Sequence, residues 1–173
     1  MSGNRENLYL IGMMGSGKTT IGELLANKLE KPFIDLDSFI ENEQDETISN
    51  IFSRDGETHF RNLEAEALKL ASGCVVACGG GVVLRRGNRT FMRSRGMVIL
   101  LTASVQELSR RVKSIDSRPL LNGPHGRVNA LEQLWDARRT KYSKTSHFSV
   151  DTEGLTPKDI CEKIICMIGN ANN

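Results

Sequence analysis

The chain has few of the side chains that build metal clusters or disulfide frameworks. Its 173 residues include one Trp, two Tyr, three His and four Cys, and the cysteines stand at positions 74, 78, 161 and 166. These spacings do not make the CxxC-type pairs of a zinc site, and a disulfide framework is not expected in a cytosolic chain of this size. We therefore expect buried free thiols and no structural metal.

Long hydrophobic runs and a strong excess of one charge are also lacking. No run approaches the roughly 18–20 apolar residues that cross a bilayer, and the first residues lack the layout of a signal peptide. Lys plus Arg number 23 and Asp plus Glu number 21, for a net charge of +2. This balance gives no reason to expect nucleic acid or a membrane as partner. We expect a cytoplasmic protein, and a monomer.

What the sequence does have is an alternation of short apolar runs with longer amphipathic stretches. The pattern predicts an α/β fold, with a five-stranded parallel sheet and helices on both faces. The predicted strands are Leu8–Ile11, Phe33–Leu36, Cys74–Cys78, Met97–Leu101 and Phe148–Val150. The predicted helices are Thr19–Leu29, Thr47–Phe52, Glu57–Ala71, Val105–Val112, Asn129–Tyr142 and Pro157–Ile168.

The length and the lack of linkers or repeats predict a single domain over residues 1–173. Two insertions interrupt the alternation, at about 38–71 and about 114–127. The second carries two prolines and two glycines and is predicted to be a loop. Active sites in open α/β sheets lie beyond the carboxyl ends of the strands, so we expect function in these insertions.

One segment matches the phosphate-loop pattern G-x-x-x-x-G-K-S/T in full, between a predicted strand and a predicted helix. It consists of Gly12, Met13, Met14, Gly15, Ser16, Gly17, Lys18 and Thr19. Glycines let backbone N–H groups curl around a phosphate, and the helix N-terminus adds partial positive charge. Lys18 is expected to reach the β- and γ-phosphates of ATP, Thr19 to ligate Mg²⁺ directly, and Thr20 to join the nucleotide contacts.

The phosphate loop alone does not name a reaction. The chain has no N-K-x-D segment, which a GTPase uses to recognise guanine, and no L-S-G-G-Q segment of an ABC-type ATPase. A small-molecule kinase remains. Alternation along a strand predicts that Asp35 and Asp37 share one face, where they could serve the metal and an acceptor hydroxyl. The alternatives are two solvated carboxylates or a helix cap, since Asp37 directly precedes a helical stretch.

Further motifs follow the phosphate loop in a fixed order. They are the Asp35-x-Asp37 pair, Asp55-Gly56-Glu57 with Phe60-Arg61 and Glu64, Gly79-Gly80-Gly81, Arg118-Pro119-Leu120-Leu121, and Arg138 with Tyr142. Together with the phosphate loop they resemble the shikimate kinase family, a P-loop family of nucleoside-monophosphate-kinase-like architecture, over nearly the whole chain. The resemblance implies phosphorylation of the 3-hydroxyl of shikimate by MgATP, which gives shikimate 3-phosphate in the aromatic amino acid precursor pathway.

The resemblance also implies roles for acceptor-site residues. Asp37 would orient or deprotonate the attacking hydroxyl, and Asp35 would reach the metal through water. Arg61 and Arg138 would hold the shikimate carboxylate, which suits the planar fork of a guanidinium. Glu64 could orient Arg61, although the alternative for this pair is a surface ion pair.

Other roles implied by the resemblance concern the walls of the two substrate sites. Phe52 and Phe60 would form the apolar wall of the acceptor pocket, with ordinary core as the alternative. Gly79, Gly80 and Gly81 would bring backbone N–H groups to the substrate, with a simple turn as the alternative. The loop at about 114–127 would act as a lid, from which Arg118 would reach the γ-phosphate. Arg111 and Pro157 would lie on either face of adenine.

One departure from the family pattern is visible around Arg138. The segment lacks the proline usually found between that arginine and Tyr142, and it offers Arg139 as a second candidate; the spacing from Tyr142 favours Arg138. Two other functions are weighed against shikimate phosphorylation. The first is another small-molecule kinase of this architecture, such as gluconate kinase. The second is a degenerate ATP-binding regulator, although none of the expected residues is damaged.

Overall fold

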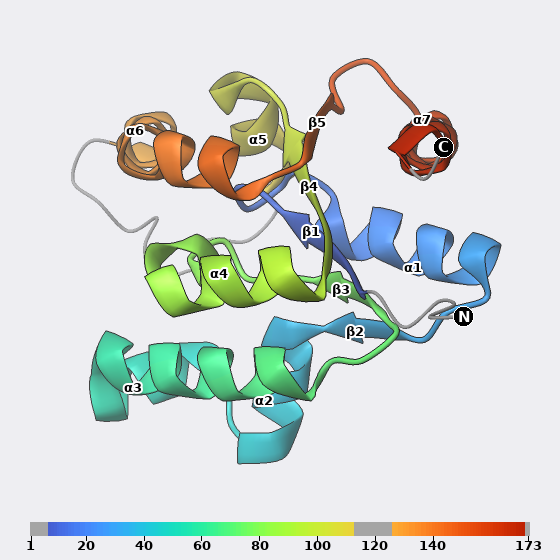
Figure 1. Cartoon of the computed structure of the whole chain (residues 1–173). Helices are drawn as coiled ribbons and strands as arrows, with labels where there is room; N and C mark the ends of the chain where they lie inside the picture. The colour runs from blue at the N-terminus through green and yellow to red at the C-terminus, as the bar shows by residue number, and fades with distance from the viewer. Residues whose placement is uncertain (1–6, 113–125, 172–173) are drawn as a thin grey trace.

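Five parallel strands form the centre of the molecule (Figure 1), in the order β2-β3-β1-β4-β5. The structure is a computed structural model and describes residues 7–112 and 126–171. The strands are β1 (Asn7–Ile11), β2 (Phe33–Asp35), β3 (Val75–Ala77), β4 (Gly96–Thr102) and β5 (Phe148–Asp151). In the register, Tyr9 of β1 pairs with Val76 on one side and Val98 on the other. The five-stranded parallel sheet is confirmed.

Helices connect the strands and cover both faces of the sheet (Figure 1). They are α1 (Lys18–Leu29), α2 (Leu36–Gln44), α3 (Ile48–Leu70), α4 (Arg86–Arg95), α5 (Val105–Arg111), α6 (Gly126–Thr145) and α7 (Pro157–Ala171), with a short 3-10 helix, η1 (Val82–Leu84). No helix within residues 7–112 and 126–171 is both long enough and apolar enough to cross a membrane.

The alternating side chains of the strands separate the core into two layers. Leu8 and Leu10 of β1 pack in a cluster with Ile21 and Leu25 of α1 and Ile164 of α7. Their neighbours Tyr9 and Ile11 face the opposite cluster, which includes Phe60 of α3, Met92 of α4 and Leu131 of α6. Strands buried on both faces explain the continuous apolar runs of the sequence.

Most predicted boundaries shift by one to three residues, and three differences have a structural consequence. Strand β2 ends at Asp35, because the Asp35 side chain caps α2 and turns the chain into a helix at Leu36. The predicted helices Thr47–Phe52 and Glu57–Ala71 form the single element α3, broken at Gly56 by a φ of 83°. Helix α6 begins at Gly126, so the last two residues of the predicted lid loop are helical; residues 113–125 lie outside the described ranges.

Helix α4 was not predicted. Its sequence, RGNRTFMRSR, has four arginines and two large apolar residues, Phe91 and Met92, in its ten positions. Asn88, Phe91 and Met92 do fall at helical spacing, but two large apolar residues among four arginines make only a short apolar pattern. Met92 is fully buried and Asn88 donates to the Val82 carbonyl, so a few tertiary contacts attach this basic helix to the sheet.

Candidate active site

The phosphate loop links β1 to α1 by a sharply turned backbone. Gly12, Gly15 and Gly17 all have positive φ, at 146°, 80° and 93°. The Lys18 ammonium lies across the loop and donates to the carbonyls of Gly12 and Met13 at 3.0 and 2.9 Å. These contacts place its charge at the mouth of the loop, where phosphate oxygens would collect.

Asp35 joins the phosphate loop to the next strand. Its Oδ2 accepts from the Thr19 hydroxyl at 2.6 Å, while its Oδ1 accepts from the backbone N–H groups of Asp37 and Ser38 at 3.1 and 3.2 Å. The prediction that strand alternation puts Asp35 and Asp37 on one face is wrong, because Asp37 already belongs to the first turn of α2. The helix cap is Asp35 rather than Asp37.

The two aspartates and the phosphate loop nevertheless share one cavity of about 490 Å³. Lys18, Thr19, Asp35 and Asp37 line it, together with Gly80 from the turn after β3. A cation from the loop, two carboxylates and a hydroxyl thus meet in a space large enough for polar small molecules.

The glycine turn after β3 permits close approach of side chains from α2 and α3. A Cβ atom at Gly79 would stand 2.7 Å from Asp37 Oδ1 and 2.8 Å from Glu64 Oε1, closer than real Cβ atoms come to oxygen. A Cβ atom at Gly81 would overlap the Arg61 guanidinium. The turn is therefore packed tightly against two carboxylates and a guanidinium. A simple exposed turn would have no such neighbours.

Arg61 on α3 is buried between acidic and aromatic side chains. Its Nη1 donates to Glu64 Oε1 and Oε2 at 3.1 and 2.9 Å, and its Nη2 donates to Glu57 Oε1 at 3.1 Å. The guanidinium carbon lies 6.0 and 5.2 Å from the ring centroids of Phe52 and Phe60. Such burial and pairing set Arg61 apart from an ordinary surface ion pair.

Glu64 is fully buried beside this arginine. Burial raises the pKa of its carboxyl to about 7, against the opposing pull of Arg61. The nearby Asp37 carboxylate pushes the pKa in the same direction as burial. Two carboxyl groups and one guanidinium are therefore electrostatically coupled around the glycine turn.

Arg138 reaches the same turn from α6. It is buried and its Nη1 donates to the Gly80 carbonyl at 3.2 Å, and the Tyr142 hydroxyl also donates to that carbonyl. Burial raises the pKa of Tyr142 to about 12, so this hydroxyl remains a donor. The next residue, Arg139, points away: its side chain is 62% exposed and lies 3.7 Å from Asp136.

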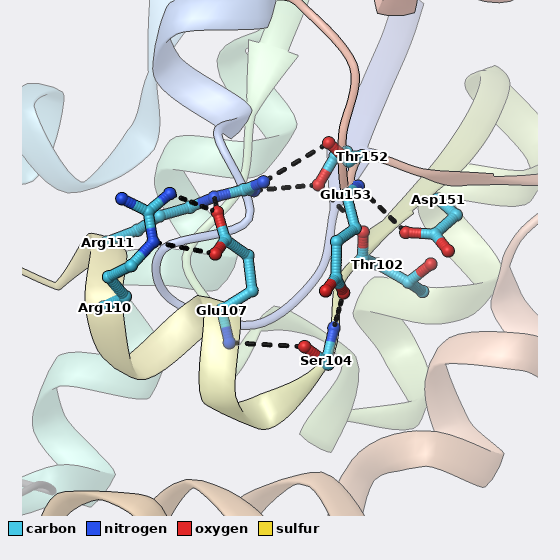
Figure 2. A network of polar contacts seen from close by, with 8 residues as sticks. All are labelled: Thr102, Ser104, Glu107, Arg110, Arg111, Asp151, Thr152 and Glu153. Atoms are coloured by element: carbon cyan, nitrogen blue, oxygen red, sulfur yellow. Dashed lines mark hydrogen bonds and ion pairs between the residues drawn. The ribbon is translucent and has the colours of Figure 1, made fainter.

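A second cavity of about 390 Å³ lies between α5, α7 and the start of α1. Arg111 and Pro157, the pair expected to enclose adenine, both line it. Arg111, Gly17 and Thr20 line the first cavity as well, so they form the wall that the two cavities share. Figure 2 shows Arg111 directed toward Thr152 and Glu107.

The sequence did not reveal every residue that the structure places around these cavities. Glu107 and Thr152 were not predicted as site residues, yet both bind the Arg111 guanidinium. The spacing of four residues from Glu107 to Arg111 was a usable helical signal, whereas Thr152 lies 41 residues from Arg111. Arg118 lies outside the described residues.

Comparison with known proteins agrees with this geometry. A family model described as shikimate kinase matches residues 14–169. The shikimate kinase of Thermodesulfovibrio yellowstonii is 42% identical over 165 residues, which cover 92% of this chain and 93% of that protein. A solved shikimate kinase from Acinetobacter baumannii, in complex with shikimate, superposes with a TM-score of 0.92 at 34% identity, covering 96% of this chain and 94% of that one.

A more distant comparison bears on the alternative kinase. A gluconokinase from Sinorhizobium meliloti superposes with a TM-score of 0.56 and is 18% identical to this chain. At that identity the likeness shows the shared kinase fold and nothing of the acceptor. The match of the family model to residues 14–169 and the 42% identity over nearly the full length show that the chain belongs to the shikimate kinase family.

Proposed function

We propose that the protein transfers the γ-phosphoryl group of ATP to the 3-hydroxyl of shikimate. The observation that carries the proposal is the meeting of Arg61 and Arg138 at the glycine turn, next to Asp37. Two buried guanidinium groups suit one planar carboxylate, and Asp37 lies beside Lys18 in the cavity of about 490 Å³. The Acinetobacter relative was solved with shikimate, which fits this chemistry.

Asp37 is the group we assign to the acceptor hydroxyl, either as its general base or as its orienting acceptor. Arg61 and Arg138 bind the shikimate carboxylate, Phe52 and Phe60 form the apolar wall, and Gly79 to Gly81 contribute backbone. The transfer itself requires an in-line arrangement and neutralisation of charge on the phosphoryl oxygens, which Lys18 and Arg118 supply. The nucleotide contacts are those of residues 12–20, Arg111, Arg118 and Pro157.

Magnesium fits the oxygen atoms at the phosphate loop. The Thr19 hydroxyl donates its proton to Asp35 at 2.6 Å, so its lone pairs remain free for a hard cation. Thr19 would hold Mg²⁺ directly and Asp35 would hold it through water. When bound, the ion supplies positive charge to the β- and γ-phosphates.

The same proposal extends to the state of the protein in the cell. We infer a cytoplasmic, monomeric, single-domain enzyme that acts on small molecules and on neither nucleic acid nor membranes. The thiols of Cys74, Cys78 and Cys161 are buried as expected, whereas Cys166 is exposed, contrary to the expectation. Free thiols suit a reducing compartment. Light scattering on a sizing column measures the oligomeric state.

The test is ADP release measured with shikimate, quinate and gluconate at equal concentrations, with MgATP saturating. We expect the highest kcat/KM with shikimate and none above background with gluconate. Asp37→Asn keeps the shape of the side chain and removes its charge, and we expect kcat to fall by about 10²–10⁴ if Asp37 is the general base. Faster turnover of gluconate than of shikimate, or a kcat and KM unchanged in Asp37→Asn, would contradict the assignment.

A further inference from the structure

Hydrogen bonds within the chain hold all three nitrogen atoms of the Arg111 guanidinium (Figure 2). Its Nε donates to Glu107 Oε1 at 2.7 Å, its Nη1 to the Thr152 hydroxyl at 2.8 Å and its Nη2 to the Thr152 carbonyl at 3.3 Å. A planar group held at all three nitrogens has one orientation. Arg111 therefore presents a fixed surface at the wall that separates the two cavities.

Thr152 is a rigid anchor for this arrangement. It is buried directly after β5, and both its backbone N–H and its hydroxyl donate to the Thr102 carbonyl at 2.9 Å. The hydroxyl thus gives its proton to β4 and offers its lone pairs to Arg111. This directionality matters, because a guanidinium has only donors and needs an acceptor.

The Glu107 carboxylate does not make the backbone hydrogen bond that is usual for a glutamate three residues after a helix N-cap. Ser104 and Glu107 make a capping-box pattern, in which the glutamate normally accepts from the backbone N–H of the serine. Here Ser104 Oγ accepts from Glu107 N at 3.3 Å, but the Ser104 N–H donates to Glu153 at 3.0 Å (Figure 2). The Glu107 carboxylate is left to bind Arg110 and Arg111.

The negative charge of Glu107 stabilises its contact with Arg111. Hydrogen bonds from Arg110 and Arg111 lower the pKa of Glu107 to about 2, so the carboxylate is ionised at neutral pH. The Arg110 side chain is 75% exposed, whereas that of Arg111 is 25% exposed. Glu107, Arg110 and Arg111 all line the second cavity, and Arg111 lines the first cavity as well.

We propose that Thr152 and Glu107 are positioning residues for the nucleotide, acting through Arg111. The inference rests on the proposed function, in which Arg111 and Pro157 enclose the base of ATP. An unrestrained arginine side chain loses conformational entropy when it binds a ligand. A side chain already held in the bound orientation loses little, so the affinity for the ligand is higher without any additional contact to it. The two residues act on the base end of the nucleotide and leave the phosphate end unchanged.

The test compares two ligands by titration calorimetry on the full chain: ADP, which has a base, and inorganic tripolyphosphate, which has none. Thr152→Val removes the hydroxyl and keeps the shape, and we expect it to weaken ADP binding about tenfold, the size of one lost hydrogen bond to a charged group. Tripolyphosphate should bind as in the unaltered protein. Thr152→Ser, which keeps the hydroxyl, should restore ADP binding.

Matched controls separate positioning from loss of structure. Thr145→Val alters a threonine that is equally buried and bonds within α6, away from Arg111, and it should leave ADP binding unchanged. Glu107→Gln should weaken ADP binding in the same direction as Thr152→Val, whereas Asp136→Asn, which alters an exposed carboxylate paired with Arg139, should not. If Thr152→Val failed to fold, the Glu107→Gln and Asp136→Asn pair would still decide the question.

Kinetics give a second readout. In Thr152→Val and Glu107→Gln the KM for ATP should rise far more than kcat falls, with the KM for shikimate unchanged. Equal weakening of ADP and tripolyphosphate, or unchanged ADP binding in both variants, would overturn the proposal. A failure of the proposed function is distinguishable, because the unaltered protein would then bind ADP without phosphorylating shikimate.

Discussion

Arg138 and Arg139 are adjacent in the sequence and lie in opposite environments. Arg138 is buried against the Gly80 carbonyl, and burying a guanidinium is unfavourable unless an anion or several acceptors face it. Arg139 is exposed, and an exposed ion pair such as its contact with Asp136 contributes about 1 kcal/mol or less. The contrast supports Arg138 as the partner of the substrate carboxylate.

We expect Arg138→Ala to lower kcat/KM for shikimate at least about 30-fold, since removing one partner of a buried charge pair costs about 2–5 kcal/mol. Arg139→Ala should lower it less than about threefold, in line with a weak exposed pair. Steady-state kinetics at saturating MgATP measure both. ADP binding to each variant is the control and should not change. A larger loss of kcat/KM in Arg139→Ala than in Arg138→Ala would assign the substrate carboxylate to Arg139 instead.

Glu64 gives a prediction about pH. Its pKa is raised from 4.5 to about 7 by burial, so the folded protein binds this proton more tightly than the unfolded chain does. The stabilising contribution is complete below about pH 4.5 and is lost as the pH rises through about 7. At about 1.4 kcal/mol per pKa unit, the rise from 4.5 to about 7 amounts to about 3–4 kcal/mol.

Urea unfolding between pH 4.5 and 8 measures this contribution. The free energy of unfolding of the unaltered protein should fall with rising pH relative to that of Glu64→Gln, which has no proton to lose. Glu57→Gln is the matched control, because Glu57 pairs with the same Arg61 and its side chain is half exposed; it should keep the pH dependence of the unaltered protein. Parallel curves for the unaltered protein and Glu64→Gln would contradict a raised pKa.

The elements show which parts of the structure the sequence can predict. The central strands β3, β1 and β4 were predicted because strands buried on both faces consist of continuous apolar residues. The edge strands β2 and β5 are less buried, and their short apolar runs between helices predicted them. The end of β2 and the start of α2 depend on one side chain, Asp35, whose capping bonds compete with strand continuation. The Arg111–Thr152 contact depends on a partner 41 residues distant in the sequence. Local patterns do not encode such contacts.

Helix α5 and the phosphate loop meet at Gly15, and this contact is testable. Gly15 has a φ of 80°, and a Cβ there would lie 3.0 Å from the Leu108 carbonyl and 3.1 Å from Val112 Cγ2. Gly15→Ala adds left-handed backbone strain of about 1–2 kcal/mol and pushes α5 from the loop. We expect a lower free energy of unfolding and weaker ADP binding.

Gly87→Ala is the matched control for this substitution. Gly87 lies in α4, and no atom outside its own helix and its immediate neighbours stands within 4 Å of the Cβ position. Alanine should therefore leave ADP binding unchanged and raise helix stability by up to about 1 kcal/mol. Urea unfolding and ADP titration of both variants give the comparison. Equal ADP affinity in Gly15→Ala and the unaltered protein would show that α5 tolerates displacement from the loop.

At the scale of the whole molecule, the strand order arranges the site from one end to the other. Asp35 ends β2 and Gly79 follows β3, the phosphate loop follows β1 at the centre, and Thr102 and Thr152 stand at the ends of β4 and β5 (Figure 1). The carboxyl ends of parallel strands lie at one edge of the sheet. The residues that we propose for the acceptor, the phosphates and the base therefore follow one another along that edge.

This arrangement predicts that the two substrates stabilise the protein independently. MgADP at 100 times its Kd adds about 2.7 kcal/mol to the free energy of unfolding. For a chain of this size, about 2–4 °C per kcal/mol gives a rise in Tm of about 5–10 °C. Removing Mg²⁺ with EDTA should reduce the rise, because the ion that we propose at Thr19 would no longer offset the charge of the phosphates.

The variant Lys18→Ala tests whether the nucleotide and shikimate bind independently. The Lys18 side chain contacts the carbonyls of Gly12 and Met13 in the phosphate loop, whereas Arg61 and Arg138 lie at the glycine turn. The variant should lose most of the Tm rise caused by MgADP and retain the rise caused by shikimate; Arg138→Ala should show the reverse. Calorimetry of both variants with each ligand gives four Tm shifts. Loss of both shifts in Lys18→Ala would mean that the phosphate loop also organises the acceptor side, contrary to the separation along the sheet edge.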